Sequence, residues 1–282
     1  MPGTLFVVAT PIGNLDDISA RALRILGQVA LIAAEDTRRT GRLLARYGIK
    51  TPTTSLHAHN EKQKTPAIIQ RLLEGNDVAL VSDAGTPTVS DPGRQLIRDA
   101  AAAGLRTEPI PGPSAAIAAL SISGFPGDTF TFLGFPPTRS QARSSWLDRL
   151  SQTRGSIIFF EAPHRIRRTL EEVRLRVGET DVVVTRELTK MHEELVRRPI
   201  SNAIEVLGTP RGELTVVLFL GDKTNINRSG PPDDARIADE YAELMERGTV
   251  MRREALRELA GRYHLTQRQV YSALERFKKC VE

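Results

Sequence analysis

Short apolar runs alternate with amphipathic segments through the first half of the chain, and this alternation limits the fold more than any other feature of the sequence. Short apolar runs are typical of buried strands, whereas apolar residues recurring every three or four positions are typical of helices. A repeat of strand and helix predicts an α/β domain with a mostly parallel sheet covered by helices. The expected strands are Leu5–Ala9, Leu31–Ala34, Thr53–Leu56 and Asp77–Ser82, and the expected helices are Ser19–Leu26, Thr40–Tyr47, Thr65–Leu73 and Asp91–Ala103.

The pattern changes at Gly124–Gly127, where Gly and Pro interrupt regular structure and predict a domain boundary. The strands expected beyond this point are less evenly spaced, which favours a second α/β domain with a mixed sheet. We therefore expect domains over residues 1–123 and 124–224. The strands of the second are Thr129–Leu133, Ser156–Phe160, Val182–Arg186, Glu194–Arg198 and Glu213–Leu220, and its helices are Ser140–Leu150, Arg165–Val177 and Ile200–Leu207.

A third, helical unit is expected over residues 235–282, after a linker at 225–234 that is rich in Asn, Gly and Pro. Its helix Arg253–Ala260, a short turn and a last helix capped by Thr266 form a helix-turn-helix arrangement. The pattern favours contact with nucleic acid, and a structural or dimer-packing role is the alternative. The apolar stripe of the last helix is Val270, Tyr271, Leu274 and Phe277.

Composition narrows the possible classes of protein. The 282 residues carry a net charge of +5, which permits a polyanionic partner, and 40% of them are hydrophobic, which is enough for a buried core. A single cysteine, Cys280, excludes an internal disulfide and a cysteine-based zinc site, and the five scattered His residues give no reason to expect a metal. The apolar start is too short for a signal peptide or a membrane span, so we expect a cytoplasmic protein.

Four turns carry the strongest signs of ligand binding, because each lies next to an apolar strand and is rich in Gly, Pro and small residues. Such turns let a backbone approach a ligand closely and direct N–H groups at its polar atoms, although any one of them could be only a tight turn. The chain lacks the Gly-rich dinucleotide fingerprint, the phosphate-binding loop and the nucleophile elbow of hydrolases. The turns are Thr10–Asn14, Ser82–Pro87, Pro111–Ala115 and Pro210–Glu213.

Six motifs, in order along the chain, identify a family. They are Thr10–Ile18 (TPIGNLDDI), Ala34–Arg38 (AEDTR), Ser82–Gly93 (SDAGTPTVSDPG), Pro111–Ala115 (PGPSA), Phe159–Arg165 (FFEAPHR) and Arg186–Lys190 (RELTK). Over residues 4–221 the chain closely resembles the ribosomal RNA branch of the tetrapyrrole methylases, the class III methyltransferases that use S-adenosylmethionine (SAM). The resemblance implies two α/β domains with SAM in a cleft between them. It also implies 2′-O-methylation of a decoding-centre cytidine in 16S rRNA, a small-subunit substrate and a homodimer.

The resemblance also indicates which residues hold SAM. SAM carries a sulfonium, an amino group, a carboxylate and an adenine, so its pocket needs backbone donors, a few carboxylates or carbonyls and apolar walls. Asp83 is the expected contact on the methionine and ribose side, although an Asp in such a turn can also only stabilise the turn. The full expected cofactor set is Ile12, Asp83, Ala84, Gly85, Thr86, Ser114, Ala115, Gly212, Glu213 and Leu214.

A ribose hydroxyl is a poor acid, so its methylation benefits from a base or from positive charge near the developing alkoxide. Glu161, His164 and Lys190 are the candidate catalytic residues, since they follow expected strand ends near the cleft. Glu161 and His164 fit the start of a helix equally well. Arg38, Arg186 and Arg268 are candidate RNA contacts.

Other functions remain open at this point. The same fold could methylate a small tetrapyrrole or a modified histidine on a translation factor. A different class of function is a non-catalytic nucleic-acid-binding regulator that uses the terminal helices. The small, polar turns at Asp83 and Ser114 argue against a protein that has lost its chemistry.

Overall fold

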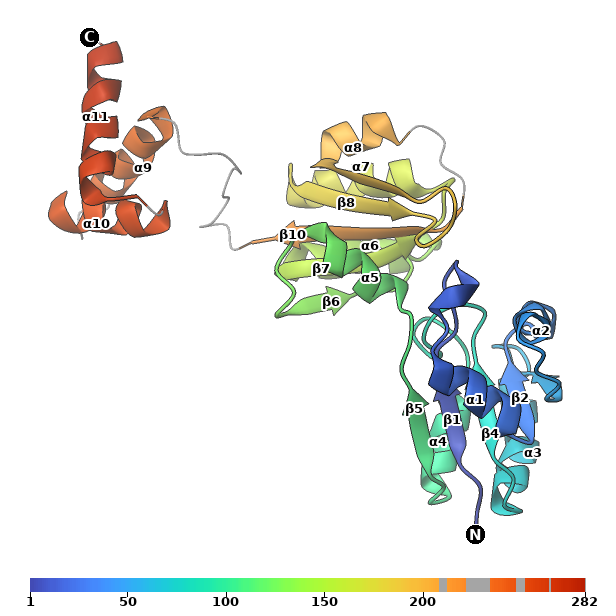
Figure 1. Cartoon of the computed structure of the whole chain (residues 1–282). Helices are drawn as coiled ribbons and strands as arrows, with labels where there is room; N and C mark the ends of the chain where they lie inside the picture. Colours follow the sequence, from blue (N-terminus) through green and yellow to red (C-terminus); the bar gives the residue numbers. More distant parts are fainter. Residues whose placement is uncertain (208–211, 222–233, 247–251, 264, 282) are drawn as a thin grey trace. The chain divides into compact units, whose positions relative to one another are not determined.

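The computed structural model describes residues 1–207, 212–221, 234–246, 252–263 and 265–281 (Figure 1). The chain divides into two compact units, Met1–Asp222 and Lys223–Glu282. Most of the linker expected at residues 225–234, and the first half of the turn expected at Pro210–Glu213, lie outside the described residues. Among the described residues, no helix is long and apolar enough to cross a membrane.

The first sheet of unit Met1–Asp222 is parallel throughout, as the alternation of strands and helices predicts. Its five strands lie in the order β3-β2-β4-β1-β5. Strand β1 lies next to the edge strand β5, and its Leu5 pairs with Val78 of β4 on one side and Thr107 of β5 on the other. The strands are β1 (Leu5–Val8), β2 (Leu31–Ala34), β3 (Thr53–Ser55), β4 (Val78–Val81) and β5 (Thr107–Ile110).

Helices cover both faces of this sheet (Figure 1). Helices α1 (Ala20–Gln28) and α2 (Thr37–Arg46) pack on one face, and α3 (Glu61–Leu73) and α4 (Arg94–Ala102) pack on the other. Neighbouring residues of a strand point to opposite faces, so β2 buries Ile32 against α1 and α2 and Leu31 against α3 and α4. Strands that are buried on both faces read as continuous apolar runs, which is why they are visible in the sequence.

Strand β5 is absent from the sequence-based prediction, and its Pro109 explains why. Proline donates no backbone hydrogen bond, so it argues against a strand in the middle of a sheet. β5 lies at the sheet edge and pairs only with β1, where Pro109 is aligned with Val7. An edge strand tolerates such a residue because one side of it needs no donor.

The predicted helix Asp91–Ala103 begins later than expected, at Arg94. Ser90, the residue before the predicted start, has a left-handed φ of 71°, and the observed cap is Gly93 with a φ of 110°. The first amides of α4 bind a side chain from another helix: Glu61 Oε1 accepts hydrogen bonds from the amides of Gly93, Gln95 and Leu96 at 3.1, 2.7 and 3.4 Å. A carboxylate from α3 therefore takes the place of a local side-chain cap.

The second sheet is mixed, as predicted. Its order is β6-β7-β10-β8-β9, in which β6 and β7 are parallel and the other neighbours are antiparallel. The strands are β6 (Phe130–Phe132), β7 (Gly155–Glu161), β8 (Asp181–Arg186), β9 (Glu194–Pro199) and β10 (Leu214–Leu220).

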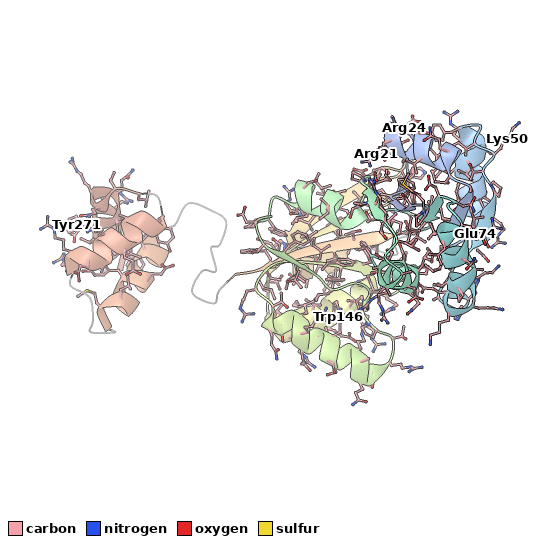
Figure 2. The ribbon with its side chains drawn as sticks, turned by 90° about the horizontal axis from the view of Figure 1, so that it is seen from below. Arg21, Arg24, Lys50, Glu74, Trp146 and Tyr271 are labelled. Atoms are coloured by element: carbon pink, nitrogen blue, oxygen red, sulfur yellow. The ribbon has the colours of Figure 1, made fainter. Side chains whose placement is uncertain are left out.

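Three helices cover one face of the second sheet, namely α6 (Ser140–Gln152), α7 (Ile166–Val177) and α8 (Ile200–Val206). Trp146 of α6, labelled in Figure 2, packs edge-on against Phe159 of β7 with ring centroids 5.2 Å apart. Helix α5 (Ala115–Ser123) packs on the opposite face of the same sheet. The chain thus leaves the first sheet before α5, while the domain boundary after residue 123 stays a prediction.

The second unit contains three helices in its described residues: α9 (Asp234–Glu246), α10 (Arg252–Arg262) and α11 (Gln267–Val281). Ile237, Leu259 and Val270 are among the residues of their shared core. Thr266 precedes α11, and its Oγ1 accepts a 3.3 Å hydrogen bond from the amide of Gln269. The prediction that Tyr271 belongs to the apolar stripe is wrong: 44% of this residue is exposed (Figure 2).

The Glu61 contact with α4 can be tested by substitution. Glu61→Ala leaves three helix amides without a protein acceptor and should lower the free energy of unfolding by about 1–2 kcal/mol. Urea unfolding of the full chain measures this, with exposed Lys62→Ala as the matched control. A loss no larger than that of the control would contradict the cap.

Candidate functional site

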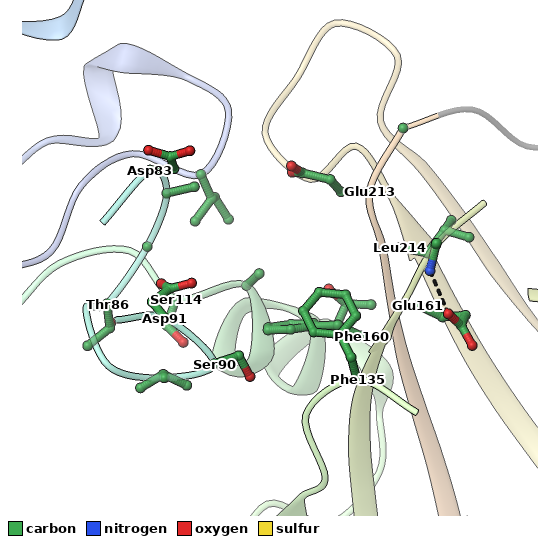
Figure 3. Close-up of a pocket in the computed structure, with 18 of the residues that line it drawn as sticks. Asp83, Thr86, Ser90, Asp91, Ser114, Phe135, Phe160, Glu161, Glu213 and Leu214 are labelled. Atoms are coloured by element: carbon green, nitrogen blue, oxygen red, sulfur yellow. Dashed lines mark hydrogen bonds between the residues drawn. The ribbon is translucent and has the colours of Figure 1, made fainter. Parts of the chain in front are cut away.

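A cavity of about 370 Å³ lies between the carboxyl edge of the first sheet and one end of the second (Figure 3). This volume is in the range of about 300–1,000 Å³ that is typical of small-molecule sites. In parallel sheets, ligands bind at the carboxyl ends of the strands, where the loops converge. The position of the cavity therefore matches the position that the strand order favours for a ligand.

The loops after β1, β2, β4 and β5 form the first wall. The loops after β1 and β4 are joined by two backbone hydrogen bonds between Thr10 and Gly85, of 2.9 and 3.0 Å. Gly85 has a φ of 75°, which favours glycine, and this turn brings Ile12 against it at the cavity. Thr86 Oγ1 donates to the carbonyl oxygen of Pro113 at 3.3 Å, which ties the β4 loop to the β5 loop.

The second wall is largely aromatic and apolar. Phe135, which follows β6, and Phe160 of β7 have ring centroids 5.3 Å apart, and both line the cavity (Figure 3). Ala162 and Pro163 follow β7, and the segment Gly212–Thr215 adds the start of β10. One wall thus presents polar turns and the other presents flat apolar surface.

The structure brings together every residue of the expected cofactor set. All ten line this one cavity, although they come from distant parts of the sequence; they are Ile12, Asp83, Ala84, Gly85, Thr86, Ser114, Ala115, Gly212, Glu213 and Leu214. Their contacts with a cofactor stay a prediction.

Glu161 lines the cavity, but its carboxylate is bonded to the protein. Its Oε1 accepts a hydrogen bond of 2.8 Å from the amide of Ala162 (Figure 3). The same oxygen lies 3.3 Å from Nε of Arg165, and Oε2 accepts a hydrogen bond of 2.5 Å from Oγ1 of Thr169. The side chain is fully buried. A carboxylate with three partners of this kind anchors the end of β7 to α7, which is a structural role.

The candidate His164 does not line the cavity; it is exposed in the turn before α7. Arg38 is also outside: its side chain is 87% exposed and pairs with Asp36 at 3.2 Å. Arg186 pairs with Glu194 at 2.8 Å. Arg268 belongs to the other unit, where it is exposed and lines a shallow groove between α9 and α11.

Lys190 is held between two carboxylates beside the cavity. Its Nζ lies 2.9 Å from Oε1 of Glu187 and 3.3 Å from Oε2 of Glu213. The same Glu187 oxygen accepts a 2.9 Å hydrogen bond from the amide of Glu213, and a Cβ at Gly212 would lie 2.2 Å from it. Lys190 and Glu187 therefore hold the segment Gly212–Leu214 in place, which is a positioning role.

The loop that contains Lys190 also contacts the first wall. The amide of Asn14 donates to Oγ1 of Thr189 at 3.0 Å, and a Cβ at Gly13 would lie 2.5 Å from Cγ of Lys190. Glu187 and Thr189 have left-handed φ angles of 51° and 66°, an unfavourable conformation for residues other than glycine. A strained loop thus joins the two walls of the cavity.

Several cavity residues were not selected from the sequence. Arg39, rather than Arg38, faces the cavity, because successive residues of a helix point in different directions. Glu35, Ser90 and Asp91 lie within the quoted motifs, so those motifs could have indicated them. Phe135 lies outside the motifs, and the sequence around it does not indicate a cavity residue. The additional lining residues are Glu35, Arg39, Val89, Ser90, Asp91, Phe135, Phe160, Ala162, Pro163 and Thr215.

Three carboxylates, Glu35, Asp83 and Asp91, gather on the first wall. Asp83 accepts a 2.9 Å hydrogen bond from the amide of Asp36 and lies 3.4 Å from Arg39. Burial, together with the charge of Asp83, raises the pKa of Glu35. Burial first, and then the charge of Glu35, raises the pKa of Asp91 to about 6. No cluster of metal-binding type occurs among the described residues.

These walls fit the chemistry of SAM. The carboxylates are suited to its cationic sulfonium and amino groups, and the small residues Ala84, Gly85 and Ala115 allow close approach of backbone donors. Phe135 and Phe160 provide flat apolar surface of the kind that an adenine requires.

Comparison with known proteins gives an independent view of the chain. The sequence pattern of the family "Tetrapyrrole (Corrin/Porphyrin) Methylases" matches residues 4–204. The chain is 48% identical over 221 residues to ribosomal RNA small subunit methyltransferase I of Pseudomonas aeruginosa, covering 77% of this chain and 78% of that one. It is 43% identical over 272 residues to the protein of the same name from Synechocystis, covering 95% and 96%. The latter match reaches into the C-terminal helices.

Two solved structures share the fold at low sequence identity. Uroporphyrin-III-C-methyltransferase from Thermus thermophilus is 21% identical with a TM-score of 0.54, covering 76% of this chain and 94% of its own. Diphthine synthase is 18% identical with a TM-score of 0.61, covering 77% and 90%.

The positioning role of Lys190 predicts a specific defect. Lys190→Met keeps the length of the side chain but removes its charge, so the segment Gly212–Leu214 loses an anchor and the affinity for SAM, the expected cofactor, should fall about fivefold, or about 1 kcal/mol. Calorimetry measures the SAM dissociation constant, with exposed Lys50→Met as the control. A large loss of turnover with unchanged SAM affinity would instead indicate a catalytic role.

Proposed function

The chain belongs to the tetrapyrrole methylase family of SAM-dependent methyltransferases, and we propose that it methylates the ribose 2′-hydroxyl of a decoding-centre cytidine in 16S rRNA. The observation that carries this proposal is the 43% to 48% identity to two enzymes named for small-subunit rRNA, over most of both chains. The tetrapyrrole and diphthine enzymes are far less similar, at 21% and 18%, and support only the fold. The nucleotide and the 2′ position follow from the motif resemblance described above.

SAM, when bound, supplies an electrophilic methyl group. In this proposal the turn Asp83–Thr86 and Ser114 bind the polar groups of SAM, and Glu213 and Leu214 contact its adenine from the second wall. The carboxylates Glu35 and Asp83 favour a cationic ligand at the first wall, and their position at the cavity supports this orientation. Lys190 acts indirectly, through the segment that it holds.

The RNA contacts are proposed on two separate surfaces. Arg38, which is exposed, lies near the end of β2, and Arg186, which is half-buried and paired with Glu194, lies at the end of β8; cations at these positions can contact phosphates. Arg268 and its neighbours on α10 and α11 provide the second surface. Because phosphate contacts carry most of the affinity of such interfaces, both surfaces are expected to bind in a salt-dependent way.

The charge of the C-terminal helices is unevenly distributed. Residues 247–282 contain nine Lys or Arg and four Asp or Glu, whereas α9 contains five Asp or Glu and a single Arg. Arg253, Arg257 and Arg268 are exposed. We therefore place the RNA-binding surface on α10 and α11 rather than on the unit as a whole. A small-subunit particle as substrate, a homodimer and a cytoplasmic location are parts of the same proposal.

The methyl transfer can be tested directly. Wild-type protein with labelled SAM should transfer one methyl group to small ribosomal subunits that lack the modification, and digestion to nucleosides should place it on the 2′-oxygen of a cytidine. Asp83→Ala should abolish transfer through loss of SAM binding. Labelled base, a label in another nucleoside, or no transfer to subunits or naked rRNA would each refute the proposal.

The assignment of the RNA surface predicts a second result. Arg257→Gln with Arg268→Gln should weaken rRNA binding and reduce the slope of log K against log salt by about one for each phosphate that the protein no longer neutralises. SAM affinity should not change, and Arg149→Gln on the exposed face of α6 serves as the control. Unchanged rRNA affinity would favour a packing role for these helices.

A further inference from the structure

The loop between β4 and α4 delivers three successive residues, Val89, Ser90 and Asp91, to the cavity. Thr88 and Ser90 in this loop have left-handed φ angles of 70° and 71°. This conformation is unfavourable for residues that carry a Cβ, so the surrounding structure must hold it in place. Figure 3 shows Ser90 and Asp91 on the side of the cavity formed by the first wall.

The carboxylate of Asp91 is not needed to cap the helix that follows. Glu61 of α3 accepts the hydrogen bonds of the Gly93, Gln95 and Leu96 amides with a single oxygen. A carboxylate just before a helix usually binds these amides itself. Here Glu61 accepts these hydrogen bonds instead, so the carboxylate of Asp91 remains available for contacts within the cavity.

Each of the other carboxylates that line the cavity is bonded to a backbone amide or a cation. Asp83 is bonded to the amide of Asp36 and to Arg39, and Glu35 accepts a hydrogen bond from the amide of Asp83 at 3.3 Å. Glu161 has three partners, and Glu213 pairs with Lys190. In the described part of the chain, Asp91 alone among them has only a hydroxyl partner, that of Ser82.

The charges around Asp91 favour proton uptake. Burial and the negative charges of Glu35 and Asp83 raise its pKa to about 6, against the effect of the Ser82 hydrogen bond. The nearby cation, Arg39, pairs with Asp83 at 3.4 Å, while Glu61 is engaged at the amides of α4. On the second wall the acids Glu161 and Glu213 line the cavity, and the cations beside them, Arg165 and Lys190, are paired with these carboxylates. A base with a pKa slightly below neutral is ionised at pH 7 and still accepts a proton readily.

We propose that Asp91 is a catalytic residue that accepts the proton of the attacking ribose hydroxyl; the inference rests on the methyl transfer proposed above. The hydroxyl oxygen forms the new bond to the methyl carbon, and the carbon–sulfur bond breaks with its electron pair going to sulfur. The hydroxyl proton passes to a carboxylate oxygen of Asp91. Charge balances, because the sulfonium becomes a neutral thioether and the carboxylate becomes a neutral acid.

The test compares Asp91→Asn with the same change at Asp99, which lies in α4 and bonds to Gln95 at 2.7 Å away from the cavity lining. Asp91→Asn should lower kcat on unmodified small subunits by about 100-fold or more, while SAM affinity by calorimetry stays unchanged. Asp99→Asn should retain wild-type kcat. Asp91→Glu, which restores a carboxylate one methylene longer, should recover part of the activity.

The pH profile separates proton transfer from a structural role. Wild-type kcat should fall below about pH 6 as Asp91 becomes protonated, and the residual activity of Asp91→Asn should lack this fall. Near-normal kcat in Asp91→Asn, a weaker affinity for SAM that accounts for the loss, or a flat wild-type profile would each overturn the inference. If the wild-type protein itself transfers no methyl to rRNA, the proposed function fails instead.

Discussion

The parallel direction of β1, β2, β4 and β5 is the constraint on which the site depends. Parallel neighbouring strands end at the same edge of a sheet. Loops that are distant in the sequence therefore meet at that edge as a result of strand direction alone. The backbone pairing of Thr10 with Gly85 then joins two of these loops into one wall. The second sheet contributes through the end of β7 and the start of β10, which are aligned because those strands pair, with Leu214 opposite Glu161.

The wall formed in this way is electrostatically costly. Glu35, Asp83 and Asp91 are close enough for their charges to disfavour one another, and partial burial increases the cost. Arg39 and the amide of Asp36 offset part of this cost at Asp83, and the amide of Asp83 and Arg39 offset part of it at Glu35. A folded apo-protein therefore retains unfavourable negative charge where a cationic ligand would be stabilised, as is common where binding residues have been selected at the expense of stability.

Local patterns predicted the sheets and the cofactor turns because both depend on short segments: buried strands are continuous apolar runs, and the turns need small residues. The failures involve side-chain partners that no local sequence pattern identifies. Glu161 reads as a free acid until Thr169 and Arg165 are placed beside it. The start of α4 depends on Glu61, which lies on another helix. The sequence pattern does not show which of Arg38 and Arg39 faces the cavity, because this depends on the residue at which α2 begins.

The separation of charge between α9 and the two helices that follow affects how the C-terminal unit would approach the rRNA that we propose as its partner. Nine acidic and ten basic residues from Asp234 onward nearly cancel, so the unit is close to neutral as a whole but carries an electric dipole. A dipole near a chain of phosphates experiences a torque in addition to an attraction. If α10 and α11 contact rRNA as proposed, the charge separation would turn these two helices toward the nucleic acid before contact, so that the orientation of the unit is selected at a distance.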